Sequence, residues 1–223
     1  MIKLLSVADL ITITNAVLGF LSVFFIFQNE FQIAASLILI GLIADGLDGM
    51  VARRYGNGTM GEFLEAIADS LSLSVAPLFL FTAMSSDAFA SSLPLQLLVG
   101  IVIVFSFVCC TVRLSSFTQF KTHSYFVGLP ASANAIFLVM SSFLPVDLWH
   151  ILPFIVLFAL LMVSPVRFPK QGIKTDAVAA GFIVAAILLT FLYEPAAPYV
   201  LLVGLLLYII VGPVYLAVKK KTS

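Results

Sequence analysis

Seven charged residues lie in the stretch from Asp45 to Asp69, within a chain that is otherwise mostly apolar. The 223-residue sequence is 62% hydrophobic and only 10% charged, with a mean hydropathy of +1.18. Burying an unpaired charge in such surroundings costs several kcal/mol or more. The fold must therefore bring these charged side chains together with partners that stabilise them, and this requirement limits what the chain can fold into.

The first half of this stretch places two carboxylates on one face of a predicted helix. At about 100° per residue, Asp45, Asp48, Gly49 and Ala52 share that face, and Arg53 lies at its edge. Two carboxylates and two very small side chains therefore point the same way. An arginine at the rim of such a face suits a phosphate ligand.

The second half repeats the arrangement on the next helix. Gly61, Glu65 and Asp69 recur at positions i, i+4 and i+8, so two more carboxylates share a face with a glycine. If the two helices are antiparallel neighbours, four carboxylates converge and repel one another. A hard divalent cation relieves such repulsion, because Mg²⁺ and Mn²⁺ take oxygen ligands and bind substrate phosphates.

This pattern resembles the signature of a known family. The run Asp45-x2-Asp48-Gly49-x2-Ala52-Arg53-x7-Gly61-x3-Glu65-x3-Asp69 is similar to that of the CDP-alcohol phosphotransferases in seven of its eight fixed residues. These are membrane enzymes that make phospholipids by displacing CMP from a CDP-linked lipid. The run departs from the signature in its seven-residue spacer, where eight residues are expected, and in Glu65, where a third aspartate is usual.

The resemblance implies a role for each residue of the run. Asp45, Asp48 and Glu65 would hold two Mg²⁺ or Mn²⁺ ions, and Asp69 would act as general base while also contacting a metal ion. Space for the nucleotide and contact with the diphosphate would come from the remaining positions, Gly49, Ala52, Gly61 and Arg53.

The distribution of charge predicts an all-α polytopic membrane protein with a single domain over residues 1–223. All eleven basic residues fall near the N-terminus or in alternate connections, which under the positive-inside rule gives about eight spans with both termini cytoplasmic. The site would then face the cytoplasm from the cell membrane. The predicted spans are 10–28, 32–54, 60–84, 93–114, 129–146, 148–165, 176–193 and 197–218.

Other polar residues in the spans have more ordinary readings. Thr12 and Thr14 are expected to make interhelical hydrogen bonds. The serines that follow Asp69 either line the nucleotide pocket or bond to backbone carbonyls, and Pro77 is expected to kink the third span.

The acceptor of the reaction is inferred from a second resemblance. Arg113-Leu114-x2-Phe117, followed by Phe126-Val127-Gly128-Leu129-Pro130, is similar to the phosphatidylserine and archaetidylserine synthase branch of the family, as is Asn15 in the first span. This implies L-serine as acceptor and CDP-archaeol or CDP-diacylglycerol as lipid. Arg113, with Lys121 as second choice, would meet the serine carboxylate, and Asn15, Gly128 and Pro130 would contact substrate. Family analogy also implies a homodimer, and nothing indicates nucleic-acid binding.

Three alternatives remain at the level of sequence. The acceptor could be glycerol phosphate or inositol phosphate, although these dianions favour more basic residues than the connection after the fourth span offers. The carboxylates could line the path of a divalent-cation transporter, which would need polar groups at mid-membrane and access to both sides. Glu65 could also mark an inactive homologue.

Overall fold

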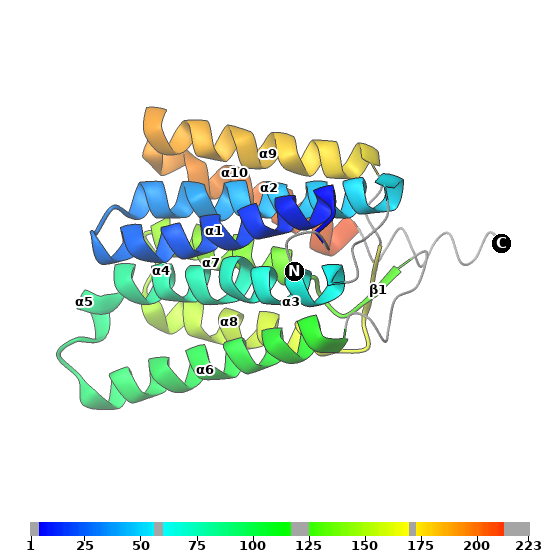
Figure 1. Cartoon of the computed structure of the whole chain (residues 1–223). Helices are drawn as coiled ribbons and strands as arrows, with labels where there is room; N and C mark the ends of the chain where they lie inside the picture. Colours follow the sequence, from blue (N-terminus) through cyan, green and yellow to red (C-terminus); the bar gives the residue numbers. More distant parts are fainter. Residues whose placement is uncertain (1–4, 56–59, 117–124, 170–172, 212–223) are drawn as a thin grey trace.

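Helices account for most of the computed structural model, which describes residues 5–55, 60–116, 125–169 and 173–211. They run roughly alongside one another in a bundle (Figure 1), as the apolar sequence predicts. Two short strands lie at one end of it. In chain order, the elements are α1 (Val7–Phe27), α2 (Phe31–Tyr55), α3 (Gly61–Asp69), η2 (Ser70–Val75), α4 (Ala76–Met84), α5 (Ser86–Phe89), α6 (Leu93–Ser116), β1 (Tyr125–Val127), α7 (Ala131–Phe143), α8 (Leu148–Met162), β2 (Arg167–Pro169), α9 (Ile173–Leu192), η3 (Glu194–Ala196), α10 (Ala197–Leu206) and η4 (Leu207–Val211).

Helix occupies part of each of the eight predicted spans, but the helices differ in length. Within the described residues, four stretches are long and apolar enough to cross a membrane, namely Val7–Phe27, Phe31–Ala52, Gly61–Met84 and Leu93–Ser116. Four others are shorter apolar helices, namely Ala131–Phe143, Leu148–Met162, Ala177–Leu192 and Ala197–Ile210. The count of eight spans and the cytoplasmic position of both termini remain predictions.

The start of α1 is fixed by a capping box. The Ser6 side chain accepts a hydrogen bond from Asp9 N at 3.2 Å, and Ser6 N donates to Asp9 Oδ2 at 2.7 Å. These two bonds satisfy backbone donors that a helix start leaves without partners. They also hold the Asp9 side chain, which is 1% exposed, at the N-terminal end of α1.

The segments α3, η2 and α4 follow one another directly and form one helical rod, Gly61–Met84, whose winding changes partway along. The helix α3 ends at Asp69, the π-helical segment η2 follows, and α4 begins at Ala76, whose N–H donates to Leu71 O. Pro77 has no N–H and its ring crowds the preceding turn, so a wider turn just before it relieves the conflict. The structure thus has a π-helical segment just before Pro77, and the kink expected at this proline remains a prediction.

Two of the serines after Asp69 bond to the backbone of their own rod. Ser70 Oγ donates to Ala66 O at 2.7 Å and Ser72 Oγ to Ala68 O at 3.0 Å. Of the two readings of this serine run, backbone bonding is therefore correct for Ser70 and Ser72.

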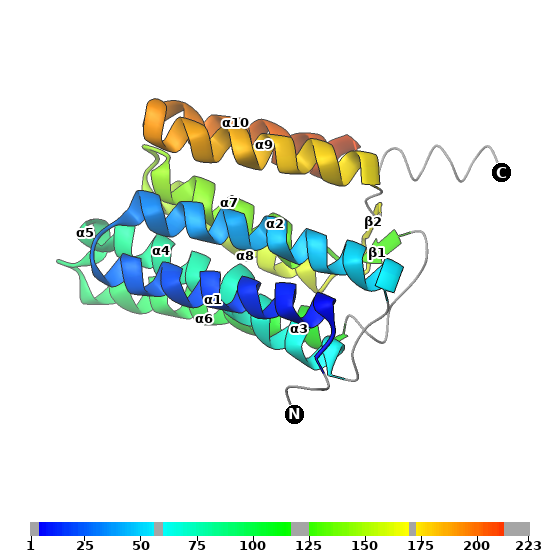
Figure 2. The ribbon, with the colours of Figure 1, turned by 45° about the horizontal axis from the view of Figure 1, so that its top comes forward.

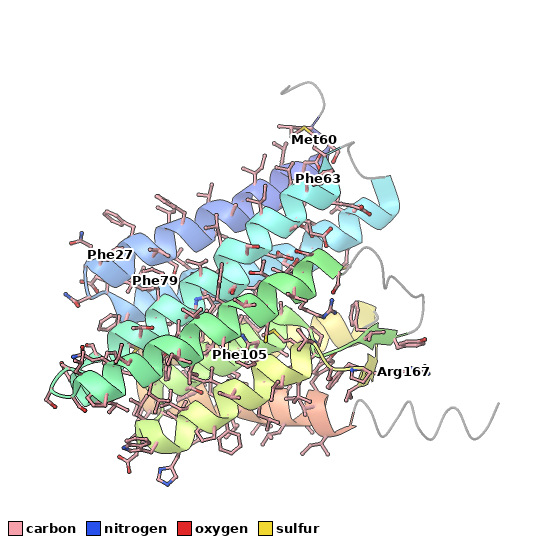
Figure 3. All side chains as sticks on the ribbon, turned by 90° about the horizontal axis from the view of Figure 1, so that it is seen from below. Phe27, Met60, Phe63, Phe79, Phe105 and Arg167 are labelled. Carbon is pink, nitrogen blue, oxygen red and sulfur yellow. The ribbon has the colours of Figure 1, made fainter. Side chains whose placement is uncertain are left out.

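The core lies among α2, α4, α7 and α8. Its largest fully buried side chains include Ile38, Phe81, Leu138 and Ile155. The helices α9 and α10 pack together along one side of the bundle, and α6 lies on the other side (Figure 2). Large apolar side chains cover the outer surface, among them Phe27, Phe63, Phe79 and Phe105 (Figure 3). An apolar exterior of this kind fits a lipid environment.

Candidate functional site

The carboxylates predicted to converge come from two neighbouring helices. Asp45 lies on α2, while Glu65 and Asp69 lie on α3. One carboxylate oxygen from each of the three lies within 4.8 Å of the others. The prediction from helical spacing that these three carboxylates converge is therefore confirmed.

The fourth predicted carboxylate, Asp48, has a protein partner on α1. Thr12 Oγ1 donates to Asp48 Oδ2 at 2.6 Å, and the Asp48 side chain is only 4% exposed. The prediction that Thr12 makes an interhelical hydrogen bond is confirmed. The same prediction is wrong for Thr14, whose hydroxyl donates to Leu10 O within its own helix.

Asn15, expected from resemblance to contact substrate, also bonds to a carboxylate. Its Nδ2 donates to Asp69 Oδ1 at 3.0 Å, and the side chain is 0% exposed. Thr12 and Asn15 are three residues apart, so they lie close together on the inner face of α1. The helix α1 thus contacts one carboxylate on α2 and one carboxylate on α3.

The small residues of the signature line a small pocket beside the carboxylates. Its volume is about 20 Å³, and it is lined by Ala8, Asp9, Thr12, Asp48, Gly49, Ala52, Gly61 and Glu65. The residues from α2 and α3 were predicted, but the α1 residues Ala8 and Asp9 were not. A helical count back from Asn15 could have found Ala8, because positions i, i−3 and i−7 share one face.

The donor set of Asp45, Glu65 and Asp69 fits a divalent metal ion. All three offer carboxylate oxygens, the ligands preferred by hard cations such as Mg²⁺ and Mn²⁺. Their oxygens lie within 4.8 Å of one another, so three ionised carboxylates here would repel each other strongly. A cation shared between them would relieve this repulsion. These three residues can therefore hold a metal ion.

Arg113, the residue predicted to meet the acceptor, is held near the C-terminal end of α6. Its side chain is 7% exposed, Nε donates to Leu129 O at 3.3 Å, and the guanidinium carbon lies 6.0 Å from the centre of the Phe126 ring. An arginine that merely anchored the helix at the membrane surface would extend its charged end into water. The burial of Arg113 instead places its charge within the protein.

Gly128 and Pro130 shape the segment that Arg113 contacts. β1 pairs antiparallel with β2, and Gly128 follows β1 with φ of 81° while its N donates to Val166 O at 2.7 Å. A Cβ at Gly128 would lie 2.2 Å from Met162 O. Pro130 then precedes the first residue of α7. Gly128 therefore has a role in backbone packing and Pro130 lies at the start of α7, while the contact of both with substrate remains a prediction.

Some predicted residues lie outside what the structure describes. Lys121 and His123 are outside the described ranges, and the Arg53 side chain is not described either. The assignment of Arg53 to the diphosphate, and of Lys121 as second choice for serine, remain predictions.

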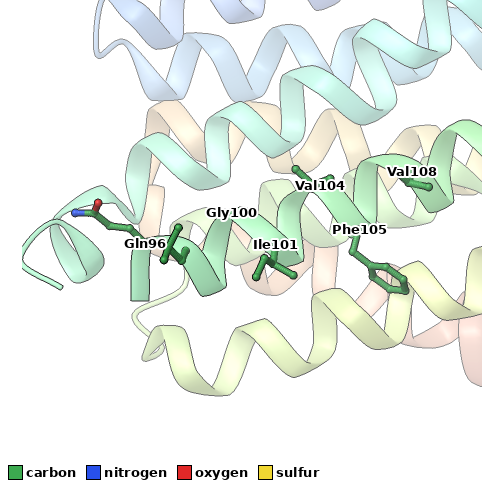
Figure 4. Close-up of a pocket in the computed structure, with 7 residues that line it drawn as sticks. Gln96, Gly100, Ile101, Val104, Phe105 and Val108 are labelled. Atoms are coloured by element: carbon green, nitrogen blue, oxygen red, sulfur yellow. The ribbon is translucent and has the colours of Figure 1, made fainter. Parts of the chain in front are cut away.

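A larger surface depression than the pocket beside the carboxylates lies elsewhere, along the exposed face of α6 (Figure 4). It is apolar and has no ionisable lining residue, so it does not suit a charged substrate. It is lined by Gln96, Leu97, Gly100, Ile101, Val104, Phe105 and Val108.

Comparison with known families agrees with the geometry of the carboxylates. The family described as CDP-alcohol phosphatidyltransferase matches residues 5–217 of the chain. This match includes all three rods that contribute to the site.

Individual relatives carry more specific names. The CDP-diacylglycerol–serine O-phosphatidyltransferase of Methanocaldococcus jannaschii is 33% identical over 178 residues, which cover 77% of this chain and 78% of the relative. The protein of the same name from Mycobacterium leprae is 29% identical, with 90% of this chain and 69% of the relative covered. The archaetidylserine synthase of Methanothermobacter thermautotrophicus is 28% identical, with 74% and 70% covered.

Proposed function

Because the chain belongs to the CDP-alcohol phosphatidyltransferase family, we propose that it transfers the phospholipid group of a CDP-lipid to L-serine and releases CMP. The observation that carries this proposal is the convergence of Asp45, Glu65 and Asp69 beside a pocket lined by small residues. The names of the similar proteins favour serine as acceptor, and CDP-diacylglycerol or CDP-archaeol as donor.

The reaction replaces one phosphorus–oxygen bond with another. The serine hydroxyl oxygen attacks the lipid-side phosphorus of the diphosphate, and the bond from that phosphorus to the bridging oxygen breaks. CMP departs with the bridging oxygen and its electron pair. The proton of the serine hydroxyl passes to Asp69, whose carboxylate accepts it as general base.

The remaining carboxylates prepare the site for this exchange. Asp45, Asp48 and Glu65, together with Asp69, form the proposed metal site, for which Mg²⁺ and Mn²⁺ are the candidate ions. Bound there, a divalent cation would neutralise the diphosphate and stabilise the charge that develops on the departing CMP. Glu65 is one methylene longer than aspartate, which changes its reach by about one bond length.

Each substrate is assigned to its own set of residues. The nucleotide lies against Gly49, Ala52 and Gly61, where larger side chains would fill the space, and Arg53 contacts the diphosphate. The serine carboxylate pairs with Arg113, since a zwitterionic acceptor needs a cation for that group.

The reaction is assigned to the cytoplasmic side of the cell membrane. The basic residues fall near the N-terminus or in alternate connections, which the positive-inside rule assigns to the cytoplasm. In this arrangement, CDP-lipid from the bilayer and serine from the cytoplasm meet at the site. In this proposal the whole chain is one catalytic unit, and by family analogy it assembles as a homodimer.

The test is CMP release by purified protein with Mn²⁺ and a CDP-lipid. L-serine, glycerol 3-phosphate and inositol phosphate are supplied separately, each with CDP-diacylglycerol and with CDP-archaeol. The proposal expects release with serine and loss of release when EDTA removes the metal. Release only with a phosphorylated acceptor would reassign the acceptor. No release with any acceptor, beside an active control enzyme, would reject the reaction and revive the inactive or transport alternatives.

A further inference from the structure

The helix α1 donates one hydrogen bond to a carboxylate on α2 and one to a carboxylate on α3. Thr12 Oγ1 donates to Asp48 Oδ2 on α2, and Asn15 Nδ2 donates to Asp69 Oδ1 on α3. The two carboxylates are 4% and 7% exposed, so both bonds are almost entirely shielded from water. Such shielded bonds to charged groups are stronger than exposed ones.

The bond from Thr12 is short. Its length of 2.6 Å lies at the lower end of the range of about 2.5–3.0 Å for hydrogen bonds from a hydroxyl to an oxygen. The same hydroxyl lies 3.2 Å from Ala8 O in its own helix. Because a hydroxyl has one proton to donate, the nearer oxygen, Asp48 Oδ2, is the favoured acceptor.

The bond from Asn15 selects between the two oxygens of Asp69. An amide nitrogen only donates, so it favours an unprotonated Oδ1 and resists rotation of the carboxylate about χ2. Oδ2 makes no contact with Asn15, and it is the oxygen assigned to a metal ion or to the proton of the acceptor hydroxyl. Asp69 also shares a side-chain hydrogen bond with Asp45. Without Asn15, that bond alone would hold the carboxylate against repulsion from Glu65.

The neighbouring backbone fixes the position of Asn15 itself. A Cβ added to Gly41 on α2 would lie 3.0 Å from Asn15 Oδ1, so the glycine allows α1 and α2 to approach each other closely here. Asn15 Oδ1 is buried and has no hydrogen-bond partner among the described residues. Leaving such an acceptor unsatisfied costs about 1–3 kcal/mol, and a residue that served only as packing would avoid that cost.

From these contacts we infer that Asn15 is a positioning residue for Asp69, and that Thr12 has the same role for Asp48. In this inference α1 orients the carboxylates before substrate binds, and Asn15 acts through Asp69 without contacting the substrates. The inference rests on the proposed function, and it changes the substrate-contact role that resemblance gives to Asn15.

The decisive variant is Asn15→Leu, which keeps a similar volume but removes the donor. Outer partners of metal-site residues typically change activity or metal affinity by about 10–100-fold when removed. We expect kcat to fall within that range, while the KM values for serine and CDP-lipid stay within about 3-fold of the parent. A residue that contacts substrate would instead raise one KM.

A second readout needs no turnover. Mn²⁺ is titrated into detergent-purified protein without substrate, and thermal stability is followed. The inference expects Asn15→Leu to need about 10-fold more Mn²⁺ for half of the stabilisation. An unchanged Mn²⁺ midpoint together with an unchanged kcat would overturn the inference. If the parent protein stabilises with Mn²⁺ but releases no CMP, the proposed function fails while the positioning role is still tested.

Conservative variants separate positioning from folding. Thr12→Ser keeps the hydroxyl and should retain the parent Mn²⁺ midpoint, whereas Thr12→Val keeps the shape, lacks the donor and should raise it. Gly41→Ala should displace the Asn15 amide and lower kcat, with Gly181→Ala as its control because no described atom lies within 4 Å of a Cβ there. If Asn15→Leu does not fold, Gly41→Ala and the Thr12 pair decide the question, and parent behaviour in all three would reject the inference.

Discussion

Gly19 of α1 lies so close to the backbone of η2 that a Cβ on it would stand 2.8 Å from Ser72 Cα. This contact lies one helical turn beyond Asn15, and it sets how near α1 comes to the rod that carries Asp69. Close approach of helices through small residues is a common way of packing helices in membranes. The contact leads to the first prediction.

Gly19→Ala should destabilise the protein by about 1–3 kcal/mol, because the added methyl group meets backbone atoms that have little freedom to move. Thermal unfolding in detergent, compared with Gly181→Ala, measures the effect. Equal melting temperatures for the two variants would show that α1 and η2 can separate without cost.

Asp69→Asn should abolish CMP release and leave CDP-lipid binding largely intact. The new side chain can still accept a hydrogen bond from Asn15 through its oxygen, so the local geometry is kept while the base is lost. Equilibrium binding of a CDP-lipid and single-turnover CMP release should be measured on the same preparation. Turnover close to that of the parent would remove Asp69 as the base.

Glu65→Asp should retain or improve activity if Glu65 is a metal ligand. Aspartate is the usual residue at this position of the signature, and the shorter side chain keeps the carboxylate that the site needs. The Mn²⁺ dependence of CMP release is the measurement, with Glu65→Gln as the variant that keeps length and loses charge. A large loss in Glu65→Asp would mean that the pocket is built around the longer side chain.

Arg113→Ala should raise the KM for serine much more than the KM for CDP-lipid. The buried guanidinium is the proposed partner of the serine carboxylate, and loss of a charge-assisted hydrogen bond of this kind costs about 1.5–3 kcal/mol, or roughly 10–150-fold in affinity. Initial rates at varied serine and fixed CDP-lipid, and the reverse, separate the two effects. Equal changes in both KM values would point to a purely structural role.

Gly128→Ala should destabilise the segment that contacts Arg113. Its φ of 81° disfavours any residue with a Cβ, and the added atom would collide with Met162 O at 2.2 Å. We expect a lower melting temperature and a raised KM for serine, with Gly100→Ala as control because, in the part of the chain that the structure describes, a Cβ there meets nothing within 4 Å. A stable variant with a normal KM would argue that β1 and β2 do not determine how Arg113 is held.

Helical periodicity predicted four converging carboxylates, and three of them, Asp45, Glu65 and Asp69, lie within 4.8 Å of one another. Positions i, i+4 and i+8 place Glu65 and Asp69 on one face, and this face does meet Asp45. The same periodicity could not show that Asp48 bonds to Thr12, because spacing along one helix does not determine how the neighbouring helix is rotated. That rotation depends on close contacts such as Gly19 with Ser72, which join residues far apart in the sequence.

The short strands were not predicted for a related reason. β1 and β2 are three residues each, and Phe126 pairs with Phe168 across a long separation in the sequence. Three residues are too few to give a recognisable alternation of apolar and polar side chains. Resemblance did indicate that the segment from Phe126 to Pro130 matters, but not that backbone packing at Gly128 is part of the reason.

The π-helical segment Ser70–Val75 has a consequence for how the chain tolerates insertion and deletion. A π turn holds more residues than the α turn it replaces, so deleting one residue there would restore regular α winding and leave the faces of α3 and α4 in nearly the same register. A deletion inside α3 or α4, where the winding is already regular, would instead turn part of the rod by about 100° and separate Asp69 from the other carboxylates or Phe81 from the core. The rod presents a charged face at one end and an apolar face at the other, and the π-helical segment between them is where the loss of one residue would disturb that relation least.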